Sequence, residues 1–440
     1  MFAVLVIGAV LSGCGPSSPS SNPSSGSGTS TSSPSSRVTD EPPPLRTPQP
    51  PSPTQAEIDR LQAAIVTDPN DAEAQRDLGF ALMQRVRETA DPSLYEPAAL
   101  AFEAARRLAP DDALVLVGIG GLHLGKHEFA AALESGRQAA ELSPSLPSAR
   151  AVVVDALVEL GRYDEADDEA TEMFALSSDL ATLARISYLA ELRGDLEVAL
   201  SAMRMAAVSP GLAPENTAYV QSLLGNLLVY SGDRAGAAEA YRAALQLVPA
   251  HAPSLAGQAR LAIGDGDLDE AIALLERASE IVPLPEYVIA LGDTQEAAGR
   301  PDDAARSVSL ARAEIQLFEA SGVVVDLDLA LFEADHGDPA RALELAMDAY
   351  EIAPTIRAAD AVAWALHRLA RDVEAKPYVD EALRLGSRDP SLRYHAGAVA
   401  AALGDVATAR RDLELALATD PGFSATGAAE ARRILQTFGE

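Results

Sequence analysis

Two short stretches contain the residue types of a metal site. Asp265, Asp267 and Asp269 are followed by Glu276 at the twelfth place, which is the acidic spacing of a calcium-binding loop. That loop also needs a glycine at its sixth position for a sharp turn, and Glu270 stands there instead. We therefore expect Asp267 to cap the start of a helix, with Glu270 completing a capping box, and calcium binding is the less favoured interpretation.

The second stretch is His123, His127 and Glu128. The two histidines have the spacing of ligands on one helical face, but Gly125 lies between them and the order differs from that of a zinc-protease helix. Two surface histidines near a turn are the favoured interpretation. The sequence contains no phosphate-binding loop, nucleophile elbow or zinc pattern. We expect no catalytic residue, metal or cofactor, and an enzyme with an unfamiliar site is the least favoured alternative.

The charge of the chain limits its partners. Its 440 residues carry a formal net charge of −31. A basic face supplies most of the affinity of nucleic-acid-binding proteins, so nucleic acid is not an expected partner. The same argument opposes broad docking on anionic lipid. Solubility is the favoured reason for the acidity, ahead of a dedicated basic partner.

The N-terminus has the features of an export signal. Residues 2–11 form an apolar run of about ten residues, which is too short to span a bilayer but fits a signal-peptide core. The run leads into Leu11-Ser12-Gly13-Cys14, which resembles the lipobox of bacterial lipoproteins, although no Lys or Arg precedes it. The resemblance implies cleavage of residues 1–13 and attachment of diacylglycerol to Cys14, the only cysteine. The protein would then be lipid-anchored to a membrane outside the cytoplasm.

Residues 14–53 are rich in Ser, Pro, Gly and Thr. Such a segment buries too little apolar surface to offset its ordering entropy, so we expect a disordered linker. A tether between membrane and folded domain is its simplest role. Recognition of the Pro-rich end by a partner is the less favoured alternative.

The rest of the chain is built from a repeated unit, best seen in Ala218–Pro249. Val220, Leu224 and Leu228 fall on one face of a first helix, Gly232 permits a turn, and Pro249 ends a second helix. The unit recurs at steps of about 33, 34 or 38 residues. Its expected turn glycines are Gly161, Gly194, Gly232, Gly266, Gly299, Gly337 and Gly404.

This pattern resembles the tetratricopeptide repeat family over residues 71–421. The match includes the family's small residue in the first helix, at Gly225, Ala259, Gly292, Ala330 and Gly397. The resemblance implies an all-α solenoid, a superhelix of about ten antiparallel helix pairs within residues 54–440. We expect single cap helices at residues 54–68 and 424–438, because terminal repeats need a solvent-facing side.

By the same resemblance, the first helices line a concave groove that binds peptides or partner helices. The groove residues carried over by repeat phase are Tyr188, Tyr219, Asn226, Tyr230, Arg260, Asp293, Glu296, Arg357, Asp360, Trp364, His367 and Tyr394. Aromatic and arginine side chains often dominate interface energetics, which favours Trp364 as an anchor. Packing of Trp364 between repeats is an equally favoured alternative.

The sequence therefore predicts a membrane-anchored, non-enzymatic scaffold that binds other proteins or peptides of the bacterial cell envelope. A receptor for a peptide or small ligand inside the superhelix is the alternative.

Overall fold

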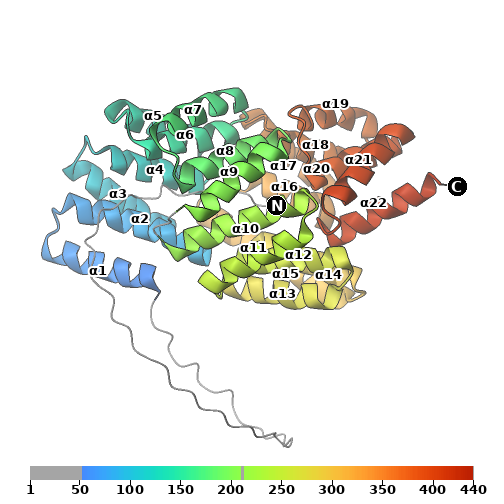
Figure 1. Cartoon of the computed structure of the whole chain (residues 1–440), viewed down its shortest axis with the longest axis horizontal. Coiled ribbons are helices and arrows are strands. Elements are labelled where there is room, and N and C mark those ends of the chain that lie inside the picture. Colours follow the sequence, from blue (N-terminus) through green and yellow to red (C-terminus); the bar gives the residue numbers. More distant parts are fainter. Residues whose placement is uncertain (1–51, 210–212, 440) are drawn as a thin grey trace, which may run out of the picture.

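A computed structural model describes residues 52–209 and 213–439. Over these residues the chain forms 22 α-helices, one short 3-10 helix and no strand, which confirms the predicted all-α solenoid (Figure 1). The predicted signal peptide, Cys14 and nearly all of the predicted linker lie outside the described residues. No helix in the described residues has both the length and the apolar character needed to cross a membrane.

The helices form ten antiparallel pairs between two single helices. The single helices are α1 (Pro53–Thr67) and α22 (Ala425–Thr437). The first helices of the pairs are α2 (Ala72–Thr89), α4 (Ala113–Gly125), α6 (Pro147–Glu159), α8 (Leu180–Leu192), α10 (Pro214–Tyr230), α12 (Ala252–Asp265), α14 (Pro285–Ala297), α16 (Asp326–His336), α18 (Ile356–Arg368) and α20 (Pro390–Ala402). The second helices are α3 (Tyr95–Leu108), α5 (Phe129–Leu142), α7 (Tyr163–Leu176), α9 (Leu196–Val208), α11 (Arg234–Leu247), α13 (Leu268–Ile281), α15 (Pro301–Ala320), α17 (Pro339–Ile352), α19 (Asp372–Ala382) and α21 (Val406–Thr419), and the 3-10 helix is Pro92–Leu94.

A Gly-Asp pair makes several of the turns within a repeat. Gly232 has φ +85°, in the left-handed region that glycine adopts without a steric cost, and Asp233 then caps α11 by accepting a hydrogen bond from the Gly236 N–H at 2.9 Å. The calcium-like stretch forms the same type of turn, because Asp267 caps α13 by accepting a hydrogen bond from the Glu270 N–H at 3.2 Å. Its acidic residues thus begin a helix, as the sequence predicts.

Two turns differ in their backbone conformation from the left-handed glycine turn seen at Gly232. Gly337 has φ −142°, so it is not a left-handed turn residue; the Glu333 carboxylate instead accepts a hydrogen bond from the Asp338 N–H and shapes that turn. In the second repeat the left-handed residue is His127 rather than Gly125, which still belongs to α4. His127 holds this conformation while its Nδ1 lies 2.6 Å from the Val324 carbonyl oxygen.

Small residues of the first helices accommodate aromatic rings of the second helices. A Cβ on Gly225 or Gly257 would overlap the ring of Tyr241, which is fully buried between α10 and α12. The same relation holds for Gly79 and Gly118 around Phe102. The glycines therefore set how closely neighbouring repeats approach.

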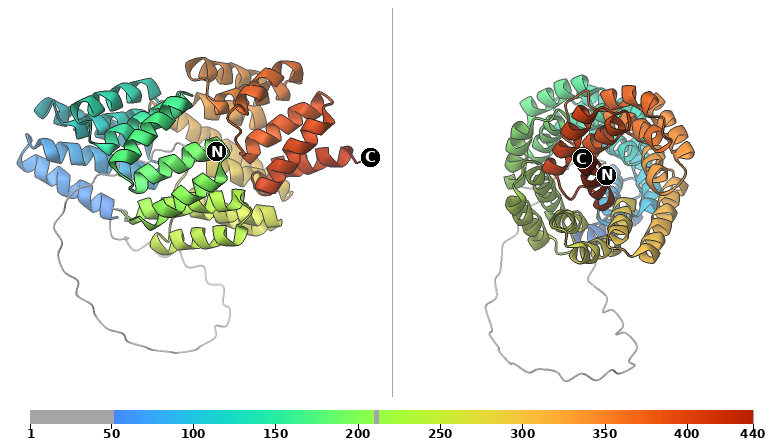
Figure 2. Two further views of the ribbon diagram at one scale, coloured as in Figure 1. Left: turned by 45° about the horizontal axis from the view of Figure 1, so that its top comes forward. Right: turned by 90° about the vertical axis from the view of Figure 1, so that its right-hand side faces the viewer.

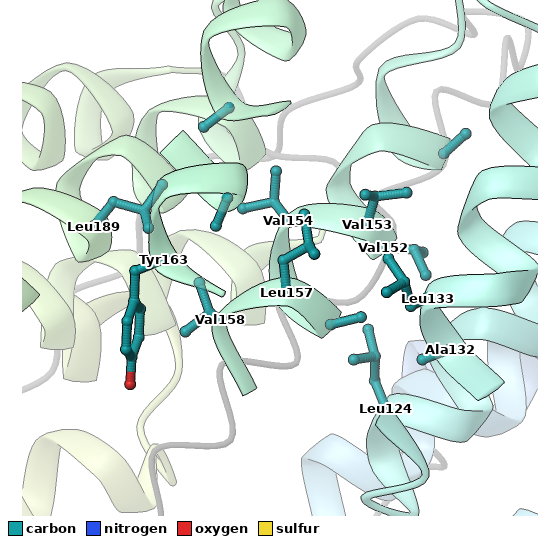
Figure 3. Close-up of a cluster of buried hydrophobic side chains, with 14 of the residues drawn as sticks. Leu124, Ala132, Leu133, Val152, Val153, Val154, Leu157, Val158, Tyr163 and Leu189 are labelled. Carbon is teal, nitrogen blue, oxygen red and sulfur yellow. The ribbon is translucent and has the colours of Figure 1, made fainter. Parts of the chain in front are cut away.

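The first helices form the inner layer of the superhelix. Several first helices contact the first helix of a neighbouring repeat, for example α4 with α6 and α18 with α20. Helices can make such contacts with every second helix of the chain only on the inside of the superhelix, where the radius is smaller. Seen along the superhelix axis, the helices form a ring (Figure 2). A first helix is covered on most sides, so Val152, Val154 and Leu157 of α6 are all buried in one cluster (Figure 3).

Segments one superhelical turn apart contact each other, and we call these contacts the seam. The Val324 N–H donates to the Lys126 carbonyl oxygen at 3.1 Å. The Ile356 N–H donates to the Tyr163 hydroxyl at 3.1 Å, across 193 residues of sequence. Figure 3 shows this tyrosine extending away from the α6 cluster. The Arg384 guanidinium lies 4.9 Å from the centroid of the same ring. The superhelix is therefore closed against itself along the seam.

Candidate functional site on the inner helices

The structure brings most of the predicted groove residues into two separate networks on the first helices. Asn226, Tyr230 and Arg260 form one network. Asp360, Trp364, His367 and Tyr394 form the other. The remaining predicted residues lie outside both networks.

Arg260 is the centre of the first network. Its Nη2 donates to the Asn226 Oδ1 at 2.6 Å and to the Tyr241 hydroxyl at 3.2 Å, and the Tyr241 hydroxyl donates to the same Asn226 oxygen at 2.7 Å. The Arg260 Nε lies 3.2 Å from the Asp420 Oδ2, and Asp420 is fully buried. Burial raises the pKa of Asp420, while Arg260 opposes that rise. The guanidinium thus joins α10 and α12 to the end of α21 across the seam.

Trp364 is the centre of the second network and is only 2% exposed. Its Nε1 donates to the Asp335 Oδ1 at 2.8 Å, and its ring stacks on His395 with centroids 4.0 Å apart. The His395 Nδ1 lies 2.8 Å from Asp360 Oδ2. This enclosure agrees with the packing interpretation of Trp364, and its role as a groove anchor stays a prediction.

The burial of Trp364 extends to its neighbours. Tyr230, Asp360 and Tyr394 are also only 5–6% exposed, so these three predicted groove residues lie at buried positions. The physical reason is the tight approach of neighbouring first helices, which covers the face that repeat phase assigns to the groove. His367 is half-buried, and its Nδ1 lies 2.5 Å from Asp372 Oδ1.

Three carboxyl groups on the inner helices have pKa values raised to about 7. Burial raises the pKa of Glu159 to about 7, with Arg357 opposing the rise and Asp155 adding to it. Burial also raises the pKa of Glu191 to about 7. Burial, with nearby Asp335 and Glu296, raises the pKa of Asp293 to about 7. These groups therefore carry partial charge near neutral pH.

The Glu159 and Glu191 side chains are half-buried and form no hydrogen bond with a described residue, and Arg357 and Arg260 respectively act on them only through longer-range electrostatics. Asp155, by contrast, forms a buried two-point pair with Arg185, at 2.8 and 2.5 Å. Removing a carboxylate from water without a partner costs free energy. The two glutamates are thus the carboxylates on this surface with capacity to bind a cationic group.

Of the other predicted residues, Tyr188 and Arg357 interact electrostatically with each other and with Glu159. Asp293 lies 3.3 Å from the His336 Nε2, and Glu296 is exposed. Arg357 is half-buried with its Nη2 4.0 Å from the Asp328 Oδ1. Tyr188 is half-buried against the α6 cluster, whereas Tyr219 lines a cavity near α1.

Sequence reasoning missed several residues of these networks. Tyr241 and Asp420 are on or after second helices, which the groove assignment did not consider. Asp155 lies six residues before the left-handed turn residue of its repeat, and Trp364 occupies the same position in its own repeat. This shared position within the repeat was sufficient to place Asp155 on the inner face. No local pattern in the sequence indicates that Asp420 meets Arg260.

The chemistry available on the inner helices is recognition through charge and hydrogen bonds. In residues 52–209 and 213–439, no group of three or more His, Cys, Asp or Glu side chains is placed to hold a metal ion. The His123 Nδ1 lies 2.5 Å from the Glu128 Oε2, while His127 bonds to the seam.

Comparisons with known proteins agree with the repeat pattern. Residues 93–147 and 222–284 match the family model of the tetratricopeptide repeat, so the chain contains tetratricopeptide repeats. None of the curated proteins compared with this chain matches it.

Three of the solved structures similar to this chain are as follows. YrrB, described as a TPR protein with an unusual peptide-binding site, is 20% identical over 42% of this chain and 93% of its own, with a TM-score of 0.29. PilF of Pseudomonas aeruginosa is 20% identical over 47% of this chain and 96% of its own, with a TM-score of 0.38. A tetratricopeptide repeat protein of Parabacteroides merdae is 16% identical over 58% of this chain and 98% of its own, with a TM-score of 0.34.

Proposed function

We propose that this chain is a non-enzymatic scaffold that binds other proteins or peptides of the bacterial cell envelope and is held at a membrane through lipidated Cys14. The repeats support the binding role, because stacked helix pairs present a long continuous surface to a partner. The lipobox-like Leu11-Ser12-Gly13-Cys14 supports the anchor.

The observation that carries the binding role is the half-buried pair Glu159 and Glu191. Both have raised pKa values and no hydrogen-bond partner in the described residues. A Lys or Arg side chain of a partner would lower these pKa values and form charge-assisted hydrogen bonds with the carboxylates. The partner segment that suits this surface is therefore basic, and the net charge of −31 would speed its approach.

Affinity capture tests the binding role. The full chain would be used as bait on the solubilised envelope of its source organism, with retained proteins identified by mass spectrometry. We expect one or two envelope proteins to be retained and to be lost with the double variant Glu159→Gln, Glu191→Gln.

The matched control is Glu344→Gln, Glu374→Gln, which changes the same charge at exposed positions of α17 and α19. If both double variants retain the same proteins as the wild type, the inner glutamates do not bind the partner and the binding role is wrong in this form.

Cys14→Ser tests the anchor separately. We expect this variant to move from the membrane fraction to the soluble fraction, measured by fractionation and immunoblotting. A variant that stays fully membrane-bound would contradict lipidation while leaving the binding role open.

A further inference from the structure

A cavity of about 880 Å³ lies between the start of the superhelix and its middle. Its walls come from α1, α2 and α3 on one side and from α10 and α12 to α15 on the other, together with residues 323 and 325. Small-molecule sites in proteins usually measure roughly 300–1,000 Å³, so this volume is of the right size for one ligand.

The cavity wall is mostly apolar and aromatic. Val86, Val282, Ile315 and Phe318 contribute to it. The rings of Tyr95, Tyr219 and Tyr287 add aromatic surface from three separate helices. Such a lining favours a ligand that buries apolar surface.

Charged side chains at the cavity pair with each other. The Arg87 Nη2 lies 2.6 Å from the Glu215 Oε2, joining α2 to α10. The Arg85 Nη1 lies 3.1 Å from the Glu88 Oε2. Glu286 also lines the cavity, and the Tyr287 side chain is hydrogen-bonded to it. The lining therefore has no excess of positive charge for an anion, and its paired and hydrogen-bonded groups suit a neutral ligand.

His251 is a lining residue of the cavity, and its ring contains a buried polar atom without a partner. The residue is 3% exposed, and its Nδ1 lies 2.8 Å from the Ser254 Oγ. Its Nε2 has no hydrogen-bond partner within residues 52–209 and 213–439. Burial lowers the pKa of His251 to about 4, so the ring is neutral at physiological pH and Nε2 can exchange one hydrogen bond with an uncharged group. Buried polar atoms without a partner are rare in native structures.

We infer that this cavity binds a neutral, predominantly apolar small molecule whose single polar group hydrogen-bonds to the His251 ring. The inference is independent of the protein-binding role, because the cavity is lined by neither Glu159 nor Glu191. The ligand would connect α1 and α2 with α12 and α14, and would thereby stabilise the approach of the first repeats to the middle of the superhelix.

The first test uses N-phenyl-1-naphthylamine, a neutral apolar fluorescent probe, titrated into the full chain. We expect saturable binding at one site. Phe318→Glu places a carboxylate at the half-buried apolar wall and should weaken binding at least about tenfold. Phe174→Glu is the matched control, because Phe174 is 46% exposed on α7 and does not line the cavity.

A second variant and a competition series keep the test independent of folding defects. Met83→Trp adds volume at the half-buried wall of α2 and should also weaken probe binding, while circular dichroism checks that helix content is retained. Dodecanol should displace the probe at lower concentration than dodecanoate or dodecylammonium, because only the alcohol is neutral. His251→Phe should reduce the advantage of dodecanol over the two charged competitors.

Three results would overturn the inference: no saturable probe binding, equal binding by Phe318→Glu and Phe174→Glu, or tighter displacement by either charged competitor. If the wild-type chain binds no probe and Phe318→Glu loses a captured envelope protein, the cavity instead accepts a side chain of a protein partner.

Discussion

Two regions of the inner layer contain the same repeat elements but are filled differently. At α18 and α20, the rings of Trp364, Tyr394 and His395 occupy the space between neighbouring first helices. At α10, α12 and α14, the N-terminal ends of the first helices leave a cavity of about 880 Å³ against α1 and α2. The comparison shows that the repeat fixes the path of the backbone, while individual side chains decide whether the space inside is closed or available.

One position of the repeat, six residues before the left-handed turn residue, shows how equivalent positions can carry side chains with different roles. It is occupied by Asn226, Arg260, Asp293 and Trp364, before Gly232, Gly266, Gly299 and Ala370 respectively. Trp364 packs and Arg260 forms ion pairs, although both start from an equivalent backbone position. Four predictions test the contrast, in order of decreasing effect.

Trp364→Ala should cost the most stability. Removing a buried indole that stacks on His395 and bonds to Asp335 leaves a cavity, with an expected loss of about 3–5 kcal/mol. Tyr219→Ala removes a half-buried side chain that already borders a cavity, and should cost about 1 kcal/mol. Urea denaturation followed by circular dichroism measures both variants. Equal losses would remove the distinction between the two regions.

Arg260→Leu should cost about 3 kcal/mol, because it leaves the fully buried Asp420 carboxylate without its ion-pair partner. Adding Asp420→Asn removes the uncompensated charge and should recover part of the loss. The double-mutant cycle measures the coupling directly. Additive losses would mean that the pair contributes nothing across the seam.

Glu159 should make stability depend on pH. Its pKa is about 7 in the folded chain and near 4.5 when unfolded, so between these values the folded state binds more protons. Its contribution to the free energy of unfolding therefore falls as pH rises from about 4.5 to 7. Glu159→Gln should flatten this slope and stabilise the protein at pH 7 by roughly 1 kcal/mol. Glu344→Gln, at an exposed position of α17, is the control, and an unchanged slope in Glu159→Gln would contradict the assignment.

The smallest effect concerns the turn after Trp364. Ala370 has φ +56°, a left-handed conformation that is strained for alanine, so Ala370→Gly should stabilise the protein by about 0.5 kcal/mol. Gly404 has φ +78° at the equivalent turn, and a Cβ there would meet no neighbouring atom. Gly404→Ala should therefore lose about 1 kcal/mol from backbone strain alone. The thermal denaturation midpoint should rise for Ala370→Gly and fall for Gly404→Ala. Midpoints that shift in the same direction would show that the left-handed conformation of the turn residue does not control the stability of the turn.

The fold could be predicted from the sequence because every repeat contains the same local signals. Turn residues such as Gly232, small residues such as Gly225 and caps such as Asp233 recur in phase, so each repeat supports the assignment of the next. Repeat phase also brought Asn226 and Arg260 correctly onto neighbouring helices.

The position of a residue within its repeat could not predict how exposed its side chain is or which distant repeats it contacts. Whether Trp364 faces a partner or a neighbouring helix depends on the distance between first helices, which local sequence does not specify. Asp420 meets Arg260 only because the superhelix returns to the same level after many repeats. Tyr219 lines a cavity for the same reason, since the opposite wall comes from the first repeats.

The seam changes what kind of folding unit this chain is. In an open solenoid each repeat touches only its neighbours, so terminal repeats can be removed one at a time with a graded loss of stability. Here the Tyr163 hydroxyl accepts from the Ile356 N–H across 193 residues, and the Arg384 guanidinium reaches the Gly161 carbonyl oxygen across 223 residues. Truncation before α18 would therefore withdraw contacts from α7 as well as from the repeats next to the cut. Such high contact order predicts slow folding and a cooperative loss of structure, in which distant repeats melt together rather than from the ends inward.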